Sequence, residues 1–280
     1  MYEAHYGLNQ LPFTLTPNTS LFHGLVPHYE AIQTILAAIK MGEGVMKVTG
    51  EVGTGKTLVC RMLINQLPSN IELVYLPNPV MSGHELRQAM AKELWLDTSG
   101  NGSALVDRIH EKLIDLQTEG RTVVVLIDEA QALSDETLET LRLFGNLETD
   151  YKKLMQIVLF GQPELNERLS QHHLRQFRQR ITFTADLRSL SLSETAAYID
   201  FRIEQSGGNT NLFPLSFKKS IWHASSGIPR VINKICHKAL LLSFTQQRTV
   251  LTRDDLYHAI VDTSDTLKPK YRFPLLWGWS

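Results

Sequence analysis

The chain has 280 residues, of which 43% are hydrophobic and 20% are charged, an ordinary composition for a globular protein with a sizeable core. Its formal net charge of -1 gives no global attraction to nucleic acid or to an anionic membrane, although a local basic patch is compatible with it. Neither a secretory signal nor an apolar stretch of membrane-spanning length is present in the sequence, so a cytoplasmic protein is expected.

Short apolar runs alternate with segments of helical periodicity over the first two thirds of the chain. The strand candidates are residues 45–49, 71–76, 122–127, 154–160 and 180–184. Such alternation predicts crossover helices and a mostly parallel α/β sheet, with ligands bound at the carboxyl ends of its strands.

The first strand candidate leads directly into the phosphate-binding pattern G-x-x-x-x-G-K-[ST]. Its residues are Gly50, Glu51, Val52, Gly53, Thr54, Gly55, Lys56 and Thr57. The glycines allow backbone N–H groups to cradle phosphate oxygens, Lys56 reaches the β- and γ-phosphates, and Thr57 places a hydroxyl on Mg²⁺. A glycine-rich turn that happens to carry a lysine is the alternative, but the strand before it and the apolar helical pattern after it favour ATP binding.

Two adjacent carboxylates, Asp128 and Glu129, end the apolar run at residues 123–127. Asp128 is expected to hold Mg²⁺ through water, and Glu129 to polarise the attacking water. The pair favours ATP hydrolysis over phosphoryl transfer to a metabolite. The alternative is a strand followed by a helix whose first turn is acidic.

Polar residues around the fourth and fifth strand candidates could complete this site. Gln162 could orient water or contact the γ-phosphate, or it could cap a helix that opens at Pro163. Arg175, Arg178 and Arg180 precede the last strand, where one could act as an arginine finger on a neighbouring subunit's nucleotide. A solvated helix face is the alternative for these arginines.

After Leu190 the pattern predicts helices alone, at residues 191–205, 215–225, 230–244 and 252–261. Arg230 lies in the first turn of the third of these and could reach the γ-phosphate.

Cys60 and Cys236 fall within apolar helical patterns, which predicts buried thiols. The tail at residues 268–280 carries three cations followed by aromatic and leucine residues. It could lie at a membrane interface or bind a partner. The alternative is a frayed terminus or a segment that covers the protein's own surface.

The order of these motifs resembles that of AAA+ ATPases with a helical lid, and the match includes Gly227-Ile228-Pro229-Arg230. Over residues 2–261 the chain is similar to the ExeA (GspA) group, most of all to ATPases of mannose-sensitive haemagglutinin (MSHA) pilus biogenesis. The start of the chain carries that likeness, in Tyr6-Gly7-Leu8, Pro12-Phe13, Thr16-Pro17-Asn18 and His28-Tyr29-Glu30-Ala31-Ile32.

The resemblance implies a P-loop core with strand order 5-1-4-3-2 at residues 1–188, including an N-terminal linker at 1–27. It further implies a small all-helical lid at 189–264 and a tail at 265–280, with ATP between core and lid and residues 28–32 along its adenine side. By position in the motifs, Gln162 matches the first sensor, Arg230 the second, and Arg180 the arginine finger that acts between subunits. ExeA-like proteins continue into a transmembrane helix and a peptidoglycan-binding part, which this sequence does not include, so cell-wall binding is not expected.

The function expected from these features is Mg²⁺-dependent ATP hydrolysis by an oligomer that supports assembly of a type IV pilus or a type II secretion machine. Its partners would then be copies of itself and assembly proteins at the inner membrane, with membrane contact limited to the tail. A nucleic-acid helper ATPase is the first alternative, although neither a helix-turn-helix appendage nor a basic stripe is evident. A nucleotide-gated scaffold with slow hydrolysis is the second.

Overall fold

The computed structural model describes residues 2–14, 24–99, 102–148 and 152–269, so Thr16-Pro17-Asn18 and most of the tail lie outside the described residues. The described chain forms two compact units, which are considered separately. The sheet unit contains residues 28–50 and 59–187, and the helical unit contains the described residues of 1–27, 51–58 and 188–280.

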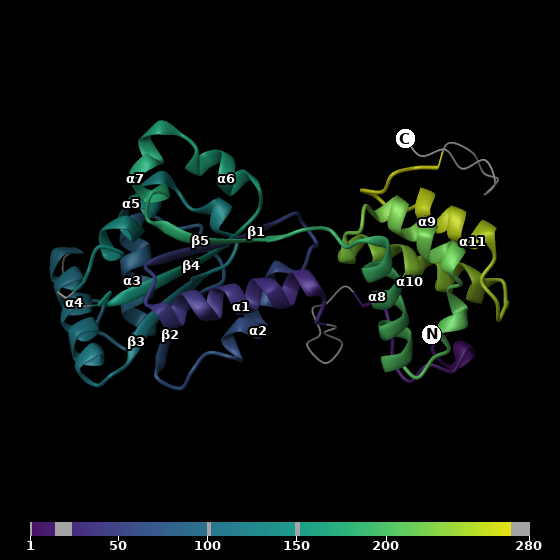
Figure 1. Ribbon diagram of the computed structural model, residues 1–280, viewed down its shortest axis with the longest axis horizontal. Coiled ribbons are helices and arrows are strands. Elements are labelled where there is room, and N and C mark those ends of the chain that lie inside the picture. Colours follow the sequence, from purple (N-terminus) through teal and green to yellow (C-terminus); the bar gives the residue numbers. More distant parts are fainter. Residues whose placement is uncertain (1, 15–23, 100–101, 149–151, 270–280) are drawn as a thin grey trace. The chain divides into compact units, whose positions relative to one another are not determined.

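A five-stranded, all-parallel sheet forms the centre of the sheet unit (Figure 1). Its strands are β1 (Val45–Gly50), β2 (Ile71–Leu76), β3 (Thr122–Ile127), β4 (Met155–Gly161) and β5 (Ile181–Leu187). The strand order is β2-β3-β4-β1-β5, which confirms the expected order 5-1-4-3-2 read from the other edge. All five strand candidates are confirmed, although β5 extends three residues further than expected.

Helices cover both faces of this sheet, as continuous apolar strands require. They are α1 (Val26–Met41), α2 (Lys56–Ile64), α3 (Gly83–Glu93), α4 (Gly102–Thr118), α5 (Asp135–Phe144), α6 (Glu164–Leu169) and α7 (Arg175–Arg178), with short 3-10 turns η3 (Ala130–Ala132) and η4 (His172–Leu174). Val123, Val125 and Ile127 of β3 share one buried cluster with α3, α4 and α5. On β4, the buried Gln156 donates from Nε2 to the carbonyl of Ile39 in α1, at 3.1 Å.

Four helices form most of the helical unit: α8 (Leu192–Gln205), α9 (Leu215–Ser225), α10 (Pro229–Thr245) and α11 (Arg253–Val261). They confirm the four helices expected after Leu190. Ser191 and Glu194 form the capping box of α8, and Pro229 occupies its first-turn position in α10. In the described part of the tail, Lys268 donates to the carbonyls of Ile260 and Val261 at the end of α11.

The N-terminal segment packs against these same helices. Tyr2 and Phe13 are each 1% exposed and belong to the core of the helical unit. The Tyr2 hydroxyl lies 2.8 Å from Nδ1 of His237, and Arg202 donates from Nε to the carbonyl of Pro12 at 2.5 Å. Residues 2–13 therefore complete the core of the helical unit.

Both cysteines, Cys60 and Cys236, are free and buried, as the sequence predicts. Over the described ranges, the longest helices are too short or too polar to cross a bilayer. In the same part of the chain, no cluster of three or more histidines, cysteines or acidic residues could hold a metal ion.

Candidate nucleotide-binding and hydrolysis site

The P-loop connects β1 to α2 through a turn that depends on glycine. Gly53 and Gly55 have φ values of 88° and 102°, a region that side chains rarely enter. Lys56 begins α2, is 6% exposed, and donates from Nζ to the carbonyl of Glu51 at 3.0 Å. Thr57 follows at the second position of the helix. Glycine conformations that lead into a helix N-terminus suit a phosphate chain.

Within the helical unit, the P-loop contacts the start of α10. The backbone N–H of Arg230 donates to the carbonyl of Gly53 at 3.2 Å. A Cβ atom at position 53 would lie only 2.6 Å from Cβ of Arg230. Gly53 is therefore required both by its φ value and by this close approach. The fold thus brings Arg230, whose side chain is exposed, to the loop that it is expected to serve.

Asp128 and Glu129 follow β3 at the carboxyl edge of the sheet. The registers place Ile127 beside Leu159 of β4, and Leu159 beside Lys47 of β1. Because adjacent strands lie about 4.8 Å apart, the end of β3 lies about 10 Å from Lys47, three residues before β1 ends at Gly50 and the P-loop begins. Asp128 is 3% exposed, and its Oδ1 accepts the backbone N–H of Glu129 at 2.9 Å.

Two amide side chains hold the carboxylate of Glu129 within the sheet unit. Gln131 donates from Nε2 to Glu129 Oε2 at 2.5 Å, and Gln162 donates from Nε2 to the same oxygen at 3.2 Å. Helix α6 has no side-chain cap, so Gln162 lies at Glu129 instead of capping the helix that follows it. Gln131 is not identified as a site residue from the sequence. Its position two residues after Glu129 is the sequence feature that could have indicated it.

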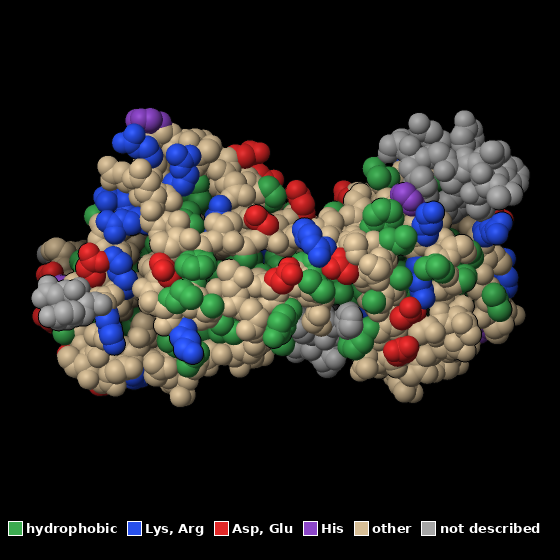
Figure 2. All heavy atoms as spheres, in the orientation of Figure 1, with side chains coloured by type: hydrophobic (Ala, Val, Ile, Leu, Met, Phe, Trp, Pro, Cys, Tyr) green, Lys and Arg blue, Asp and Glu red, His purple; other side chains and the backbone are tan. Residues whose placement is uncertain are grey.

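Arg180 lies at the opposite, amino edge of the sheet. It precedes Ile181, which pairs with Val45 at the start of β1. Five residues of strand separate Val45 from Gly50, about 16 Å at 3.3 Å per residue. Arg175, Arg178 and Arg180 are all exposed, and Figure 2 shows Lys and Arg side chains on the surface around α7. Among the described residues of the sheet unit, Arg180 thus lies at the edge opposite to Asp128 and Glu129.

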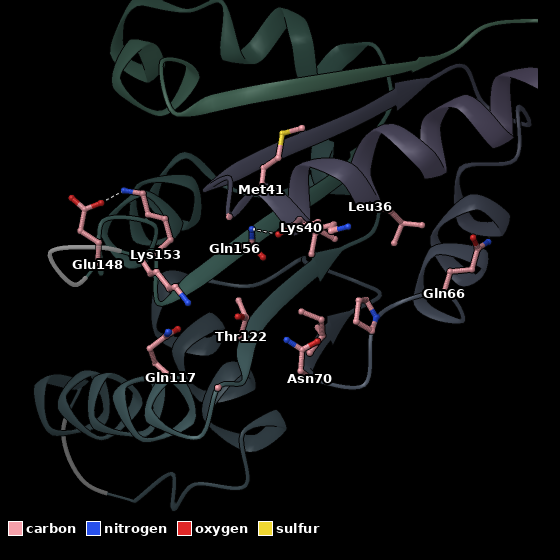
Figure 3. Close-up of a pocket in the computed structure, with 16 residues that line it drawn as sticks. Leu36, Lys40, Met41, Gln66, Asn70, Gln117, Thr122, Glu148, Lys153 and Gln156 are labelled. Carbon is pink, nitrogen blue, oxygen red and sulfur yellow. Dashed lines mark hydrogen bonds and ion pairs between the residues drawn. The ribbon is translucent and has the colours of Figure 1, made fainter.

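A hollow of about 1250 Å³ also opens at the amino edge (Figure 3). Lys40, Gln117 and Thr122 are among the residues that line it, and one wall carries the ion pair of Lys153 with Glu148. The charge of Lys153 and its hydrogen bond lower the pKa of Glu148, to which Arg180 also contributes. This hollow lies across the length of the strands from Asp128 and Glu129.

The buried polar groups beneath α2 are held neutral. Burial, together with the smaller effect of the nearby charge of Asp128, raises the pKa of the Cys60 thiol to about 12. Burial also raises the pKa of Tyr75 to about 12. Neither group is ionised near neutral pH.

The donor atoms fit a nucleotide with Mg²⁺. A threonine hydroxyl at Thr57 and a carboxylate at Asp128 are hard oxygen donors, which Mg²⁺ prefers. Two protein oxygens do not fill the coordination shell of Mg²⁺, which ordinarily keeps water and phosphate oxygens as its other ligands. The residues present are therefore those that a magnesium nucleotide needs.

Comparison with known proteins agrees with this geometry. Residues 39–169 match the family model of an AAA domain. The chain is 39% identical over 266 residues to general secretion pathway protein A of Aeromonas hydrophila. That match covers 94% of this chain and 49% of the relative, so the chain spans about half the length of the curated relative.

Solved structures share the fold at low sequence identity. The ORC2 protein of Aeropyrum pernix has a TM-score of 0.63 at 14% identity, over 89% of this chain and 72% of that one. The RuvB Holliday junction branch migration motor of Thermotoga maritima has a TM-score of 0.57 at 17% identity, over 89% of this chain and 73% of that one. Over most of its own length the chain is thus similar to general secretion pathway protein A, and part of it matches an AAA domain.

Proposed function

We propose that this protein binds ATP with Mg²⁺ at the P-loop and hydrolyses it with Glu129 as the group that activates water. One observation carries the proposal: β1 and β3 end at the same edge of one parallel sheet, the first in the P-loop and the second in Asp128 and Glu129. This edge is where open α/β sheets bind their ligands.

Each residue has a distinct part in the proposed reaction. Lys56 binds the β- and γ-phosphates, and Thr57 and Asp128 hold the magnesium ion, which when bound supplies positive charge to the phosphates. Glu129 accepts the proton of the attacking water. Gln162 contacts Glu129 directly and is proposed as the first sensor. Arg230, whose backbone is bonded to Gly53, is proposed as the second.

The test is ATP turnover by the parent and two variants. Lys56→Ala is expected to lose nucleotide binding, and Glu129→Gln to lower kcat by about 10²-fold or more while ATP stays bound. Filter binding separates the two effects, since only Glu129→Gln retains labelled ATP. Turnover by both variants at the parent's rate would exclude this mechanism.

The biological setting is a second part of the proposal. The name of the Aeromonas relative, general secretion pathway protein A, supports a role in a type II secretion machine. The likeness of the start of the chain to MshM, the ATPase of MSHA pilus biogenesis, supports a type IV pilus of the MSHA kind. In either case we propose that the protein forms an oligomer. This oligomer acts in the cytoplasm or peripherally at the inner membrane, together with assembly proteins.

A gene deletion distinguishes these settings. Complementation with the parent, but not with Lys56→Ala, is expected to restore surface pili or secreted enzymes, and the restored trait identifies the machine. Rescue by Lys56→Ala of the trait that the parent restores would contradict a role for nucleotide binding. Turnover that is stimulated by DNA and weakens steeply with salt would instead favour a nucleic-acid helper. Partner capture that depends on ATP in the near absence of turnover would favour a scaffold.

A further inference from the structure

Gln131 joins Glu129 to Gln162 at the proposed hydrolysis site. Its Nε2 donates to Glu129, and its Oε1 accepts the backbone N–H of Gln162 at 3.1 Å. A backbone N–H can only donate, so this bond fixes which end of the Gln131 amide is oxygen. The other end must then present N–H groups to Glu129.

The backbone of Gln131 is anchored as well. Arg168 donates from Nη1 to the carbonyl of Gln131 at 2.8 Å and also binds the carbonyl of Leu133. Its Nη2 reaches Asp135, whose other oxygen lies 2.8 Å from Nε2 of His173, just before α7. These contacts hold η3 in place, so the position of the Gln131 side chain does not depend on its own packing alone.

The hydrogen bonds leave the two oxygens of Glu129 unequal. Both amides donate to Oε2, and among the described residues none donates to Oε1. Glu129 itself has a φ of 53° and a ψ of 37°, a left-handed conformation that is uncommon for a residue with a side chain. A strained backbone and a fixed side chain together hold one carboxylate oxygen in a defined direction.

We propose that Gln131 is a positioning residue for ATP hydrolysis, which holds Oε2 of Glu129 so that Oε1 faces the attacking water. The proposal rests on the proposed function, because it needs Glu129 to activate water. It adds a residue that acts on the reaction only through Glu129. A carboxylate must point correctly to accept a proton, since small displacements of a reacting group lower rates strongly.

The experiment compares two substitutions at position 131 in the full chain. Gln131→Met keeps the length of the side chain and removes both polar atoms. Gln131→Glu keeps an acceptor for the N–H of Gln162 but replaces the donor with a like charge. Both are expected to lower kcat about tenfold or more, with the Kd for ATP and the Tm close to the parent's. Gln171→Met, an exposed glutamine of the same unit, is the matched control and is expected to match the parent.

A double-mutant cycle separates positioning from a general structural role. The rate of single-turnover hydrolysis is measured over long incubations. Adding Gln131→Met to the Glu129→Gln protein is expected to leave this rate unchanged, because the carboxylate that Gln131 positions is already absent. An equal fall in both backgrounds, or an unchanged kcat in both position-131 variants, would overturn the proposal. If Gln131→Met does not fold, Gln131→Glu carries the same cycle.

The failure of this inference is distinguishable from that of the proposed function. If Glu129→Gln hydrolyses ATP at the parent's rate, Glu129 does not activate water and the function itself is wrong. If Glu129→Gln is slow while both position-131 variants are as fast as the parent, only the role of Gln131 is wrong.

Discussion

The two edges of the central sheet differ in what their residues do. At the carboxyl edge, Asp128, Glu129, Gln131 and Gln162 form hydrogen bonds with one another in a confined space. At the amino edge, Arg180 is exposed and a hollow of about 1250 Å³ is lined by separate polar side chains. The carboxyl edge thus joins its polar side chains in one hydrogen-bonded group, while the charge of Arg180 at the amino edge acts on Glu148 and lies away from that group.

The largest expected effect concerns Arg180. Arg180→Ala is expected to lower kcat by about 10³-fold, because an arginine finger stabilises charge on the transferring phosphoryl group. Size-exclusion chromatography with light scattering should show that the oligomer persists. Arg175→Ala and Arg178→Ala are the matched controls from the same surface. If either lowers kcat more than Arg180→Ala does, the finger is assigned to the wrong arginine.

A substitution at Gly53 tests whether the conformation of the P-loop requires glycine. Gly53→Ala is expected to lower the free energy of unfolding by about 1–2 kcal/mol, because its φ of 88° is unfavourable for alanine. The added Cβ also meets Arg230, so ATP binding should weaken. Denaturant unfolding and ATP titration measure the two effects. Gly120→Ala is a useful control, since Gly120 has a φ of 75° but no atom within 4 Å of its added Cβ.

A carboxylate of the helical unit should affect stability and not turnover. The bond from Arg188 and the capping contacts of Ser191 hold the pKa of Glu194 at about 2, below its ordinary 4.5. The lowered pKa means that ionised Glu194 stabilises the fold above pH 4.5 and that this contribution is lost as the pH falls towards 2. Glu194→Gln is expected to cost about 1–2 kcal/mol at pH 7 and progressively less below pH 4.5.

Urea unfolding at several pH values measures this effect, with kcat at pH 7 as the second readout. A stability cost that stays constant down to pH 2 would show that the charge of Glu194 is not what matters.

The smallest effect is expected at the amino-edge hollow. Lys153→Ala removes an ion pair with the exposed Glu148 and should leave kcat and the Kd for ATP at the parent's values, because exposed ion pairs contribute little. A clear loss of turnover would mean that the two edges are not as separate as the sheet suggests.

Much of this arrangement could be predicted from the sequence because it depends on local patterns. Five apolar runs gave the strands, and the spacing of Gly50, Lys56 and Thr57 gave the loop after the first of them. Ser191 and Glu194 gave the start of α8 for the same reason, since a capping box involves residues only three positions apart.

Contacts between distant segments could not be predicted in this way. The bond of Gln162 to Glu129 joins residues 33 positions apart, and that of Arg168 to Gln131 joins residues 37 apart. Neither leaves a periodic signal. The same holds for Tyr2, which packs against His237 in the helical unit, although the sequence suggested a linker of the α/β core for residues 1–27.

We propose that a neighbouring subunit's Arg180 completes the site that contains Glu129. Mixing Glu129→Gln and Arg180→Ala proteins in equal amounts tests it directly, once subunits have exchanged. Each variant alone is inactive, but mixed oligomers contain sites in which an intact Glu129 faces an intact Arg180 from the neighbour. Turnover is expected to recover to about a quarter of the parent's, the share of such sites under random assembly. Turnover no higher than the mean of the two separate proteins, in oligomers shown to be mixed, would contradict it.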